Sequence, residues 1–226
     1  MWNIKHFIHS IKNAPRYFRV FEAIKTTKPG LILRHDVDWS IEDAYKFFII
    51  ERENKIKSTY YFRASSPTYN LYSKENKKIL REIDSSGFEV GLHFDKSIYK
   101  KNILDNFLKE KSIIEEILGK KIFSYSDHMP SSNGYFKKKV NIFNAYDKKI
   151  FIKKNYISDS RYEYKKNLFN FINQSNSKKM YCLIHPEYYF DNKRSYSLII
   201  NRYLKNSKKK IINEIKLNNK NYKKFK

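Results

Sequence analysis

Residues 30–38 read GLILRHDVD, and this stretch decides how the chain folds. Its first four residues are glycine and aliphatic side chains, which predict a buried strand, and the polar residues after them lie at the carboxyl end of that strand. Ser40 then fits a helix N-cap, with Glu42 and Asp43 in the first turn of a helix that runs to about Asn54. A buried strand that leads directly into a helix is typical of a parallel α/β fold.

The same alternation of strands and helices continues along the chain. Further strands are predicted at 58–63, 88–93, 121–125 and 180–184, with one more candidate around 149–156. Further helices are predicted at 2–12, 73–86 and 102–118. We therefore expect one α/β domain over residues 1–200, with a mostly parallel sheet that is open or closed into a barrel. Residues 201–226 hold ten basic residues and one acid, and we expect a basic tail that begins as a helix and frays.

Polar residues that are unusual in a core follow the ends of the predicted strands. They are His35, Asp36 and Asp38; Arg63; His93 and Asp95; Asp127 and His128; and His185 and Glu187. Four of the 6 histidines of the chain belong to this set. Because parallel α/β folds place their ligand sites at the carboxyl ends of the strands, we expect these side chains to meet in one site.

The pair Asp36 and Asp38 points to metal chemistry. The two residues are separated by one, so strand alternation sends both side chains the same way, and a divalent cation relieves the repulsion between their charges. Taken alone, the pair fits the capping of the following helix equally well. Asp38, His93 and a third donor form a set suited to zinc or another borderline divalent ion. His128 is the candidate for that third ligand, and Asp95 is the alternative.

His185 ends another buried strand and is followed by Pro186, which makes a position inside a helix improbable. A histidine, with its ordinary pKa near ~6.5, suits the work of a general acid that protonates a leaving amine. Glu187 is expected to orient His185 or to bind a substrate hydroxyl. The alternative is a structural histidine packed beneath the aromatic residues 188–190.

Three short motifs resemble those of a known family, in the same order. The stretches LRHDVD at 33–38, FEVGLH at 88–93 and LIH at 183–185 are similar to motifs of the polysaccharide deacetylase superfamily, the NodB-type carbohydrate esterases. The resemblance spans roughly residues 30–190. It implies an irregular (β/α) barrel of about seven strands, a divalent metal, and hydrolysis of an N-acetyl or similar amide on a sugar.

The resemblance also implies roles for individual residues. Asp36 matches the catalytic base and Asp38 the metal-binding aspartate. His93 matches the first metal histidine, and His185 matches the acid of the last motif. The remaining metal histidine of the family would fall at position 97, which is a serine here, and this departure is why we place His128 in the metal site.

A second departure concerns an arginine. The family's Arg-x-Pro motif has no recognisable counterpart, so Arg34, Arg63 or Arg161 is expected to pair with the catalytic carboxylate. Asp159 lies in the same segment as Arg161 and is a supporting candidate. The residues proposed to hold the sugar are Tyr61, Arg63 and Tyr188, since aromatic faces stack on pyranose rings.

Charge and composition set the remaining expectations. The net charge of +24 comes mostly from lysine, while arginine, which suits phosphate and base contacts, is sparse, so we expect no specific nucleic-acid partner. With one cysteine and no evident signal peptide, we expect a cytoplasmic protein that acts on a nucleotide- or lipid-linked sugar in glycan assembly. The basic tail is a candidate for peripheral membrane contact. The alternatives are a catalytically inactive glycan-binding protein on the same barrel and, less favoured, a basic nucleic-acid-binding protein.

Overall fold

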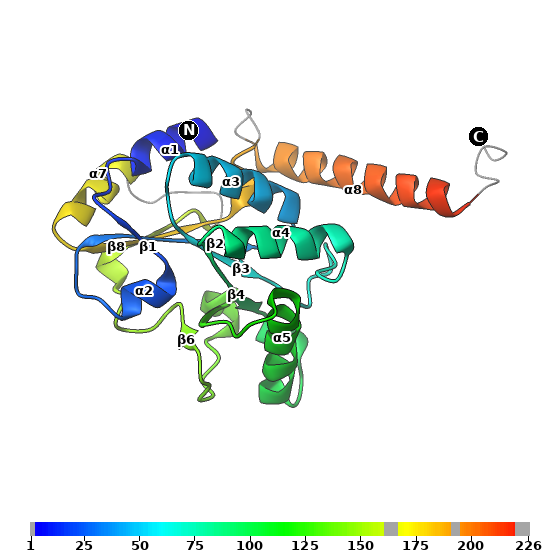
Figure 1. The fold of residues 1–226 in the computed structure, drawn as a ribbon, viewed down its shortest axis with the longest axis horizontal. Coiled ribbons are helices and arrows are strands. Elements are labelled where there is room, and N and C mark those ends of the chain that lie inside the picture. The colour runs from blue at the N-terminus through cyan, green and yellow to red at the C-terminus, as the bar shows by residue number, and fades with distance from the viewer. Residues whose placement is uncertain (1–2, 161–166, 191–194, 220–226) are drawn as a thin grey trace.

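A computed structural model describes residues 3–160, 167–190 and 195–219 of the chain. A curled parallel sheet forms the centre of the molecule, and helices cover its outer face (Figure 1). The strands are β1 (Tyr17–Phe18), β2 (Gly30–Val37), β3 (Thr59–Phe62), β4 (Glu89–Phe94), β5 (Ser124–Asp127), β6 (Phe143–Asn144), β7 (Tyr156–Ser158) and β8 (Lys179–Ile184). The main path runs in the order β6-β5-β4-β3-β2-β8-β7, and β1 pairs beside β2. The irregular barrel of about seven strands is thereby confirmed.

The helices fill the connections between these parallel strands. They are α1 (Ile4–Ile11), α2 (Val20–Ile24), α3 (Ile41–Glu53), α4 (Lys74–Ser85), α5 (Ile103–Leu118), α6 (Pro130–Asn133), α7 (Leu168–Asn173) and α8 (Tyr196–Asn218). Short 3₁₀ turns are η1 (Lys96–Ile98), η2 (Lys153–Asn155), η4 (Gln174–Asn176) and η5 (Pro186–Tyr188). Ser40 caps α3 as predicted, because its Oγ accepts a hydrogen bond from the backbone N–H of Asp43 at 3.2 Å.

Strand alternation divides each strand between the helical layer and the barrel interior. On β2, Leu31, Leu33 and Val37 face outward and pack in the two large hydrophobic clusters under the helices. Arg34 and Asp36, on the other face, are joined inside the barrel. All of β2 is buried. Its inward-facing charged side chains therefore lie in a barrel interior that is shielded from solvent.

Tyr61 fills the middle of the barrel and explains why position 91 is a glycine. In the register of the sheet, Asp36 of β2 lies opposite Tyr61 of β3, and Tyr61 lies opposite Gly91 of β4. A Cβ at Gly91 would approach the Tyr61 ring and the backbone oxygen of Ser124, each at 2.5 Å. The glycine therefore lets the Tyr61 ring lie against β4. The ring separates the two ends of the barrel interior.

The short elements are where the sequence-based predictions were wrong. The strand predicted at 121–125 begins later, at Ser124, and runs through Asp127. The strand predicted around 149–156 is instead irregular and includes the turn η2, and the strand β7 begins only at Tyr156. The elements β1, α2 and α7 were not predicted. Strands of two or three residues are held by their neighbours in the sheet, so they leave too short a periodic pattern to detect.

The last helix behaves differently from the rest. Residues of the expected tail continue a single 23-residue helix, α8, that begins at Tyr196 and extends beyond the body of the molecule (Figure 1). Its start is held in place, because Ile199 is fully buried and Arg202 forms an ion pair with Asp43 at 3.0 Å.

Candidate active site

Three of the predicted metal ligands converge at the carboxyl end of the sheet. Asp38 Oδ1 lies 3.2 Å from His93 Nε2 and 3.7 Å from His128 Nε2. One donor atom from each of the three residues lies within 4.8 Å of the others. Two ligand atoms that each lie about 2.1 Å from a tetrahedral ion are about 3.4 Å apart, so the separations of 3.2 and 3.7 Å from Asp38 Oδ1 are compatible with a bound metal ion.

The chemistry of these donors also fits a divalent ion. Asp38 Oδ1 and Asp36 Oδ1 are both buried and accept no hydrogen bond from the residues that the structure describes. Burial alone would raise the pKa of Asp38, but the imidazoles of His93, His185 and His128 hold it well below its usual range. A buried carboxylate without hydrogen-bond donors is costly, and coordination of a cation removes that cost.

In both His93 and His128, the ring nitrogen that does not face Asp38 lies near an oxygen atom of the protein. His93 Nδ1 faces the backbone oxygen of Ser126 at 3.3 Å. His128 Nδ1 lies 3.0 Å from Asp95 Oδ2, although the angle is not that of a hydrogen bond. Both arrangements turn Nε2 toward Asp38, as is usual for histidines that bind a metal.

Asp95 supports the metal site from outside it. Its Oδ2 accepts a hydrogen bond from Arg63 at 2.8 Å, and its Oδ1 accepts from the backbone N–H and the hydroxyl of Ser97. Arg63 therefore neutralises Asp95 and does not pair with the base. Ser97 stabilises the Asp95 carboxylate, which lies beside His128. The geometry favours His128 rather than Asp95 as the third ligand.

The predicted base, Asp36, is buried and held by an arginine. Arg34 donates a hydrogen bond to Asp36 Oδ2 at 3.1 Å, and Ser126 Oγ donates to the same atom at 3.2 Å. Arg34 is completely buried and also donates to Tyr146 and Tyr181. Of the three arginines considered for pairing with the catalytic carboxylate, Arg34 makes that contact, while Arg161 lies outside the described residues.

His185 is paired with Asp159 and borders Asp38. Its Nδ1 lies 2.5 Å from Asp159 Oδ1, and its backbone N–H donates to the other carboxylate oxygen at 2.8 Å. Its Nε2 points to the site, 3.8 Å from Asp38 Oδ2. Burial acts to lower the pKa of His185, but the charge and hydrogen bond of Asp159 outweigh it and raise the pKa to about 10. Asp159 thus fixes both the direction and the charge of this imidazole.

Glu187 has a different role from the one predicted. Its Oε1 accepts hydrogen bonds from three successive backbone N–H groups, those of Asp38, Trp39 and Ser40. It is almost fully buried, so it is not placed to meet a substrate hydroxyl. It holds the loop that carries Asp38 and leads into α3.

Three further predictions about individual side chains need correction. Tyr61 is fully buried and bonded to Ser124, so it presents no face to a sugar. Tyr188 is also buried, and its ring lies beside His185 at 5.4 Å between centroids. His35 points out of the barrel toward Glu51 at 2.8 Å, because alternation places it on the face opposite to Asp36.

Sequence reasoning missed several residues that build the site. Ser126 contacts both Asp36 and His93. Tyr146 packs over Arg34, whose guanidinium carbon lies 4.3 Å from the centroid of the tyrosine ring. Tyr69 donates a hydrogen bond to the backbone oxygen of Val37, at the end of β2. The alternation of Ser124, Tyr125 and Ser126 could have placed Ser126 inside the barrel, but nothing in the sequence connects Tyr146 or Tyr69 to the site.

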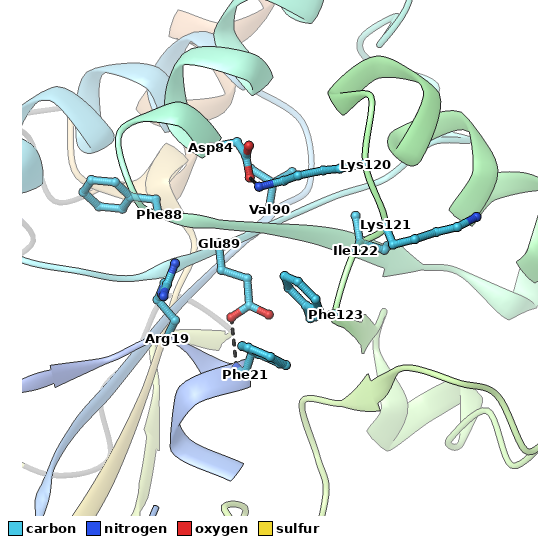
Figure 2. Close-up of a pocket in the computed structure, with 10 residues that line it drawn as sticks. All are labelled: Arg19, Phe21, Asp84, Phe88, Glu89, Val90, Lys120, Lys121, Ile122 and Phe123. Carbon is cyan, nitrogen blue, oxygen red and sulfur yellow. Dashed lines mark hydrogen bonds and ion pairs between the residues drawn. The ribbon is translucent and has the colours of Figure 1, made fainter. Parts of the chain in front are cut away.

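A pocket at the other end of the barrel does not compete with this site. Figure 2 shows it around Glu89, the first residue of β4, with Phe21 and Phe123 nearby. Its lysines are already paired, Lys120 with Asp84 at 2.7 Å and Lys121 with Glu115 at 3.3 Å. Both oxygens of Glu89 accept hydrogen bonds. The carboxylates and lysines of this pocket are therefore paired with neighbouring side chains or with the backbone, and they form no donor set for a metal in the described structure.

Comparisons with known proteins give the fold. No family model and no curated protein matches the chain. A CE4 family pseudoenzyme from Bacillus anthracis superposes with a TM-score of 0.50 and 18% identity, over 79% of this chain and 62% of that protein. The peptidoglycan deacetylase PdaC from Bacillus subtilis superposes with a TM-score of 0.50 and 16% identity, over 81% of this chain and 85% of that one. The chain therefore spans less than two thirds of the length of the first protein, and its fold is that of the polysaccharide deacetylases.

Proposed function

We propose that this chain is a metal-dependent deacetylase that hydrolyses an N-acyl amide, such as an N-acetyl group, on a sugar. The observation that carries the proposal is the convergence of Asp38, His93 and His128, with Asp36 beside His93 and His185 beside Asp38. Asp38, His93 and His128 would hold the metal, for which zinc suits the donor set. When bound, a divalent ion polarises the amide carbonyl and lowers the pKa of water toward ~7.

Asp36 is proposed as the base that removes a proton from the attacking water. Its Oδ2 lies 3.8 Å from His93 Nε2, so the carboxylate borders the metal-binding atoms without belonging to their set. Arg34 and Ser126 fix this oxygen, which leaves Oδ1 without a hydrogen-bond donor in the described structure. A carboxylate held in this way is placed to accept the proton while the water oxygen bonds to the carbonyl carbon.

His185 is proposed as the acid that protonates the leaving nitrogen. Its Nε2 lies 3.8 Å from Asp38 Oδ2, so it borders the same group of donor atoms as Asp36. As the carbon–nitrogen bond breaks, the proton of Nε2 passes to the amine, and acetate and the free amino sugar are the products. Asp159 holds the ring and stabilises the imidazolium that precedes this step.

The recognition of the sugar falls to residues other than those first predicted. Tyr146 lies over Arg34 at the site, and the ring of the exposed Tyr135 contacts it at 5.2 Å between centroids. We propose these two tyrosines as the aromatic surface for a pyranose ring. A nucleotide- or lipid-linked sugar in a cytoplasmic step of glycan assembly is the proposed substrate class.

The test is acetate release by the protein loaded with zinc or cobalt. The substrates are an N-acetylglucosamine oligosaccharide and a nucleotide-linked N-acetyl sugar. We expect turnover with one of them and one metal ion per chain. Asp36→Asn should keep the metal and lose turnover by about 10³-fold, since the base is removed but no ligand is. Undiminished turnover in Asp36→Asn would overturn the assignment of the base.

A fully metal-loaded protein that binds these sugars without releasing acetate would contradict the catalytic proposal. It would favour the glycan-binding alternative on the same barrel. Equilibrium dialysis with the two sugars distinguishes this outcome from a failure to bind any of them.

A further inference from the structure

The helix α8 presents an apolar stripe that nothing in the described structure covers. Leu204, Ile211 and Ile215 are 55%, 60% and 45% exposed. They are spaced by seven and four residues, so at 100° per residue they fall within an arc of about 40° on one side of the helix. The half-buried Ile200 continues the line toward the body of the molecule. We call Leu204, Ile211 and Ile215 the α8 stripe.

The opposite side of α8 is the one that the rest of the chain holds. Tyr203 contacts Trp39 at 5.3 Å between ring centroids, and Arg202 is bonded to Asp43 and to the backbone oxygen of Glu187. Farther along, Lys210 forms an ion pair with Glu42 of α3. Because these contacts fix the rotation of the helix about its axis, the α8 stripe faces solvent as a defined surface.

Lysines lie along one side of the α8 stripe. At 100° per residue, Lys208 and Lys205 fall about 40° and about 100° from Leu204, and Lys209 falls about 140° from it. All three are exposed, and none of them forms an ion pair with any residue in the described ranges. The helix as a whole carries six basic residues and one acid, Glu214. An apolar stripe beside unpaired lysines matches a surface with an anionic outer layer and an apolar layer beneath it.

We propose that α8 lies on the surface of an anionic lipid bilayer, with the α8 stripe inserted among the acyl chains and the lysines against the headgroups. In the described part of the chain no helix combines the length and apolarity needed to cross a bilayer, so the contact is interfacial. Each lysine near such a surface contributes about fivefold in affinity, and the apolar side chains add the energy of their burial.

Two other occupants fit the α8 stripe less well. In a coiled coil with a second copy, the heptad register that places Leu204, Ile211 and Ile215 in the core also places Asn201 and Lys208 there. Pairing would also bring the lysines of two copies together. A nucleic acid would attract the lysines, but its phosphates offer no apolar surface for the stripe.

The placement of α8 bears on the candidate active site. Tyr203 donates a hydrogen bond to the backbone oxygen of Thr68 at 3.4 Å, and Arg202 reaches the backbone of Glu187, which holds the loop of Asp38. A membrane-bound α8 would therefore tether the segment beside the candidate active site to the bilayer surface. If the proposed deacetylase function holds, this favours a lipid-linked glycan as its substrate; the membrane contact itself does not depend on that function.

The experiment is co-sedimentation of the full chain with vesicles. The vesicles are either pure phosphatidylcholine or contain about a third of phosphatidylglycerol. The variant Leu204→Gln/Ile211→Gln/Ile215→Gln removes the apolar stripe but keeps good helix formers on an exposed face. The matched control changes three other exposed apolar residues, in Leu108→Gln/Ile152→Gln/Phe169→Gln. Circular dichroism and thermal melting verify that both variants fold.

We expect the wild type to bind the anionic vesicles at least tenfold more tightly than the zwitterionic ones. The stripe variant should lose at least tenfold in affinity for anionic vesicles, while the control stays within about twofold. Lys205→Gln/Lys208→Gln/Lys209→Gln should also lose at least tenfold.

Dependence on the apolar residues decides the outcome, because a chain of net charge +24 adsorbs to any anionic surface to some extent. Equal binding by the wild type and the stripe variant would overturn the proposal. Binding to duplex DNA that the stripe variant loses to the same degree would overturn it in favour of nucleic acid. Concentration-dependent dimers that the stripe variant abolishes would favour a second copy. Metal content and acetate release, measured on the same variants, report separately on the proposed function.

Discussion

The two ends of the barrel interior hold buried carboxylates in opposite conditions. At the amino end of the strands, Glu89 accepts hydrogen bonds from Phe21, Thr59 and Ser124, and both of its oxygens have donors. At the carboxyl end, Asp36 and Asp38 each retain a buried oxygen without one. The fully bonded carboxylate stabilises the fold, whereas the incompletely bonded pair keeps two oxygens free in the described structure to accept a ligand, as the proposed function requires.

The difference teaches how to separate structural from functional charges in this fold. Glu89 and Asp36 are both buried, so burial alone does not distinguish the two ends. What distinguishes them is whether each carboxylate oxygen has a hydrogen-bond donor, and whether the neighbouring groups form a donor set for a metal. The following changes test that distinction, beginning with the largest expected effect.

Removing a charge at the carboxyl end should abolish metal binding. In Asp38→Asn, the carboxylate shared by His93 and His128 is lost, so we expect no stoichiometric metal and a loss of turnover of about 10³-fold or more. Metal analysis after dialysis and acetate release measure the two effects. Glu89→Gln at the amino end is the matched control and should retain both. Retention of one metal ion per chain by Asp38→Asn would contradict the proposed ligand set.

Asp159 should matter for catalysis but not for the metal. Asp159→Asn loses the charge that orients His185, and we expect kcat to fall about 10²-fold while KM and metal content change little. Because the two residues act as a unit, Asp159→Asn should cost little more when it is added to His185→Gln. Additive losses in the double variant would show that Asp159 acts apart from His185.

Asp95 should tune the affinity for the metal. Asp95→Asn weakens the group that faces His128 Nδ1, so we expect the dissociation constant for zinc to rise about 10- to 100-fold. Ser97→Ala removes one donor to Asp95 and should have a smaller effect in the same direction. Competition with a chelator of known affinity measures both. An unchanged dissociation constant in Asp95→Asn would place Asp95 outside the support of the site.

Glu89 should matter for stability and not for turnover. Glu89→Ala leaves buried donors on Phe21 and Thr59 without an acceptor, and we expect the free energy of unfolding to fall by about 3 kcal/mol. Glu89→Gln keeps an acceptor oxygen and should lose less. Urea denaturation measures the loss, and the kcat/KM of the folded fraction should equal that of the wild type. If turnover fell by more than the unfolded fraction explains, Glu89 would also act in catalysis. The contrast between the two ends of the barrel would then be wrong.

Much of the fold was predictable because its periodic elements are long. The stretch at 30–38 predicted a buried strand, and the helices α1, α3, α4 and α5 fall where the apolar spacing and the caps place them. Such signals are local, since a strand or helix of this length carries its own pattern of buried and exposed positions. The two-residue strands β1 and β6 exist because a neighbouring strand pairs with them, and no local pattern announces that.

The candidate site divides along the same line. The strand-end positions of Asp36, Asp38, His93, His128 and His185 could be inferred from the sequence, because alternation and the direction of the strands are local properties. Alternation also implied that His35 and Asp36 face opposite ways, but the sequence could not tell that the partner of His35 is Glu51 and that of Asp36 is Arg34.

By itself, the sequence determined the strand-helix alternation, the end of the sheet where polar groups gather, and the residue types that suit a metal. The tertiary structure alone decided which partner each of those groups has: Arg34 for Asp36, Asp159 for His185, and backbone N–H groups for Glu187. The reason is that these contacts join positions distant in the chain, or side chains whose shared face depends on how the sheet curls. Such contacts are fixed by the packing of the whole barrel rather than by any local preference.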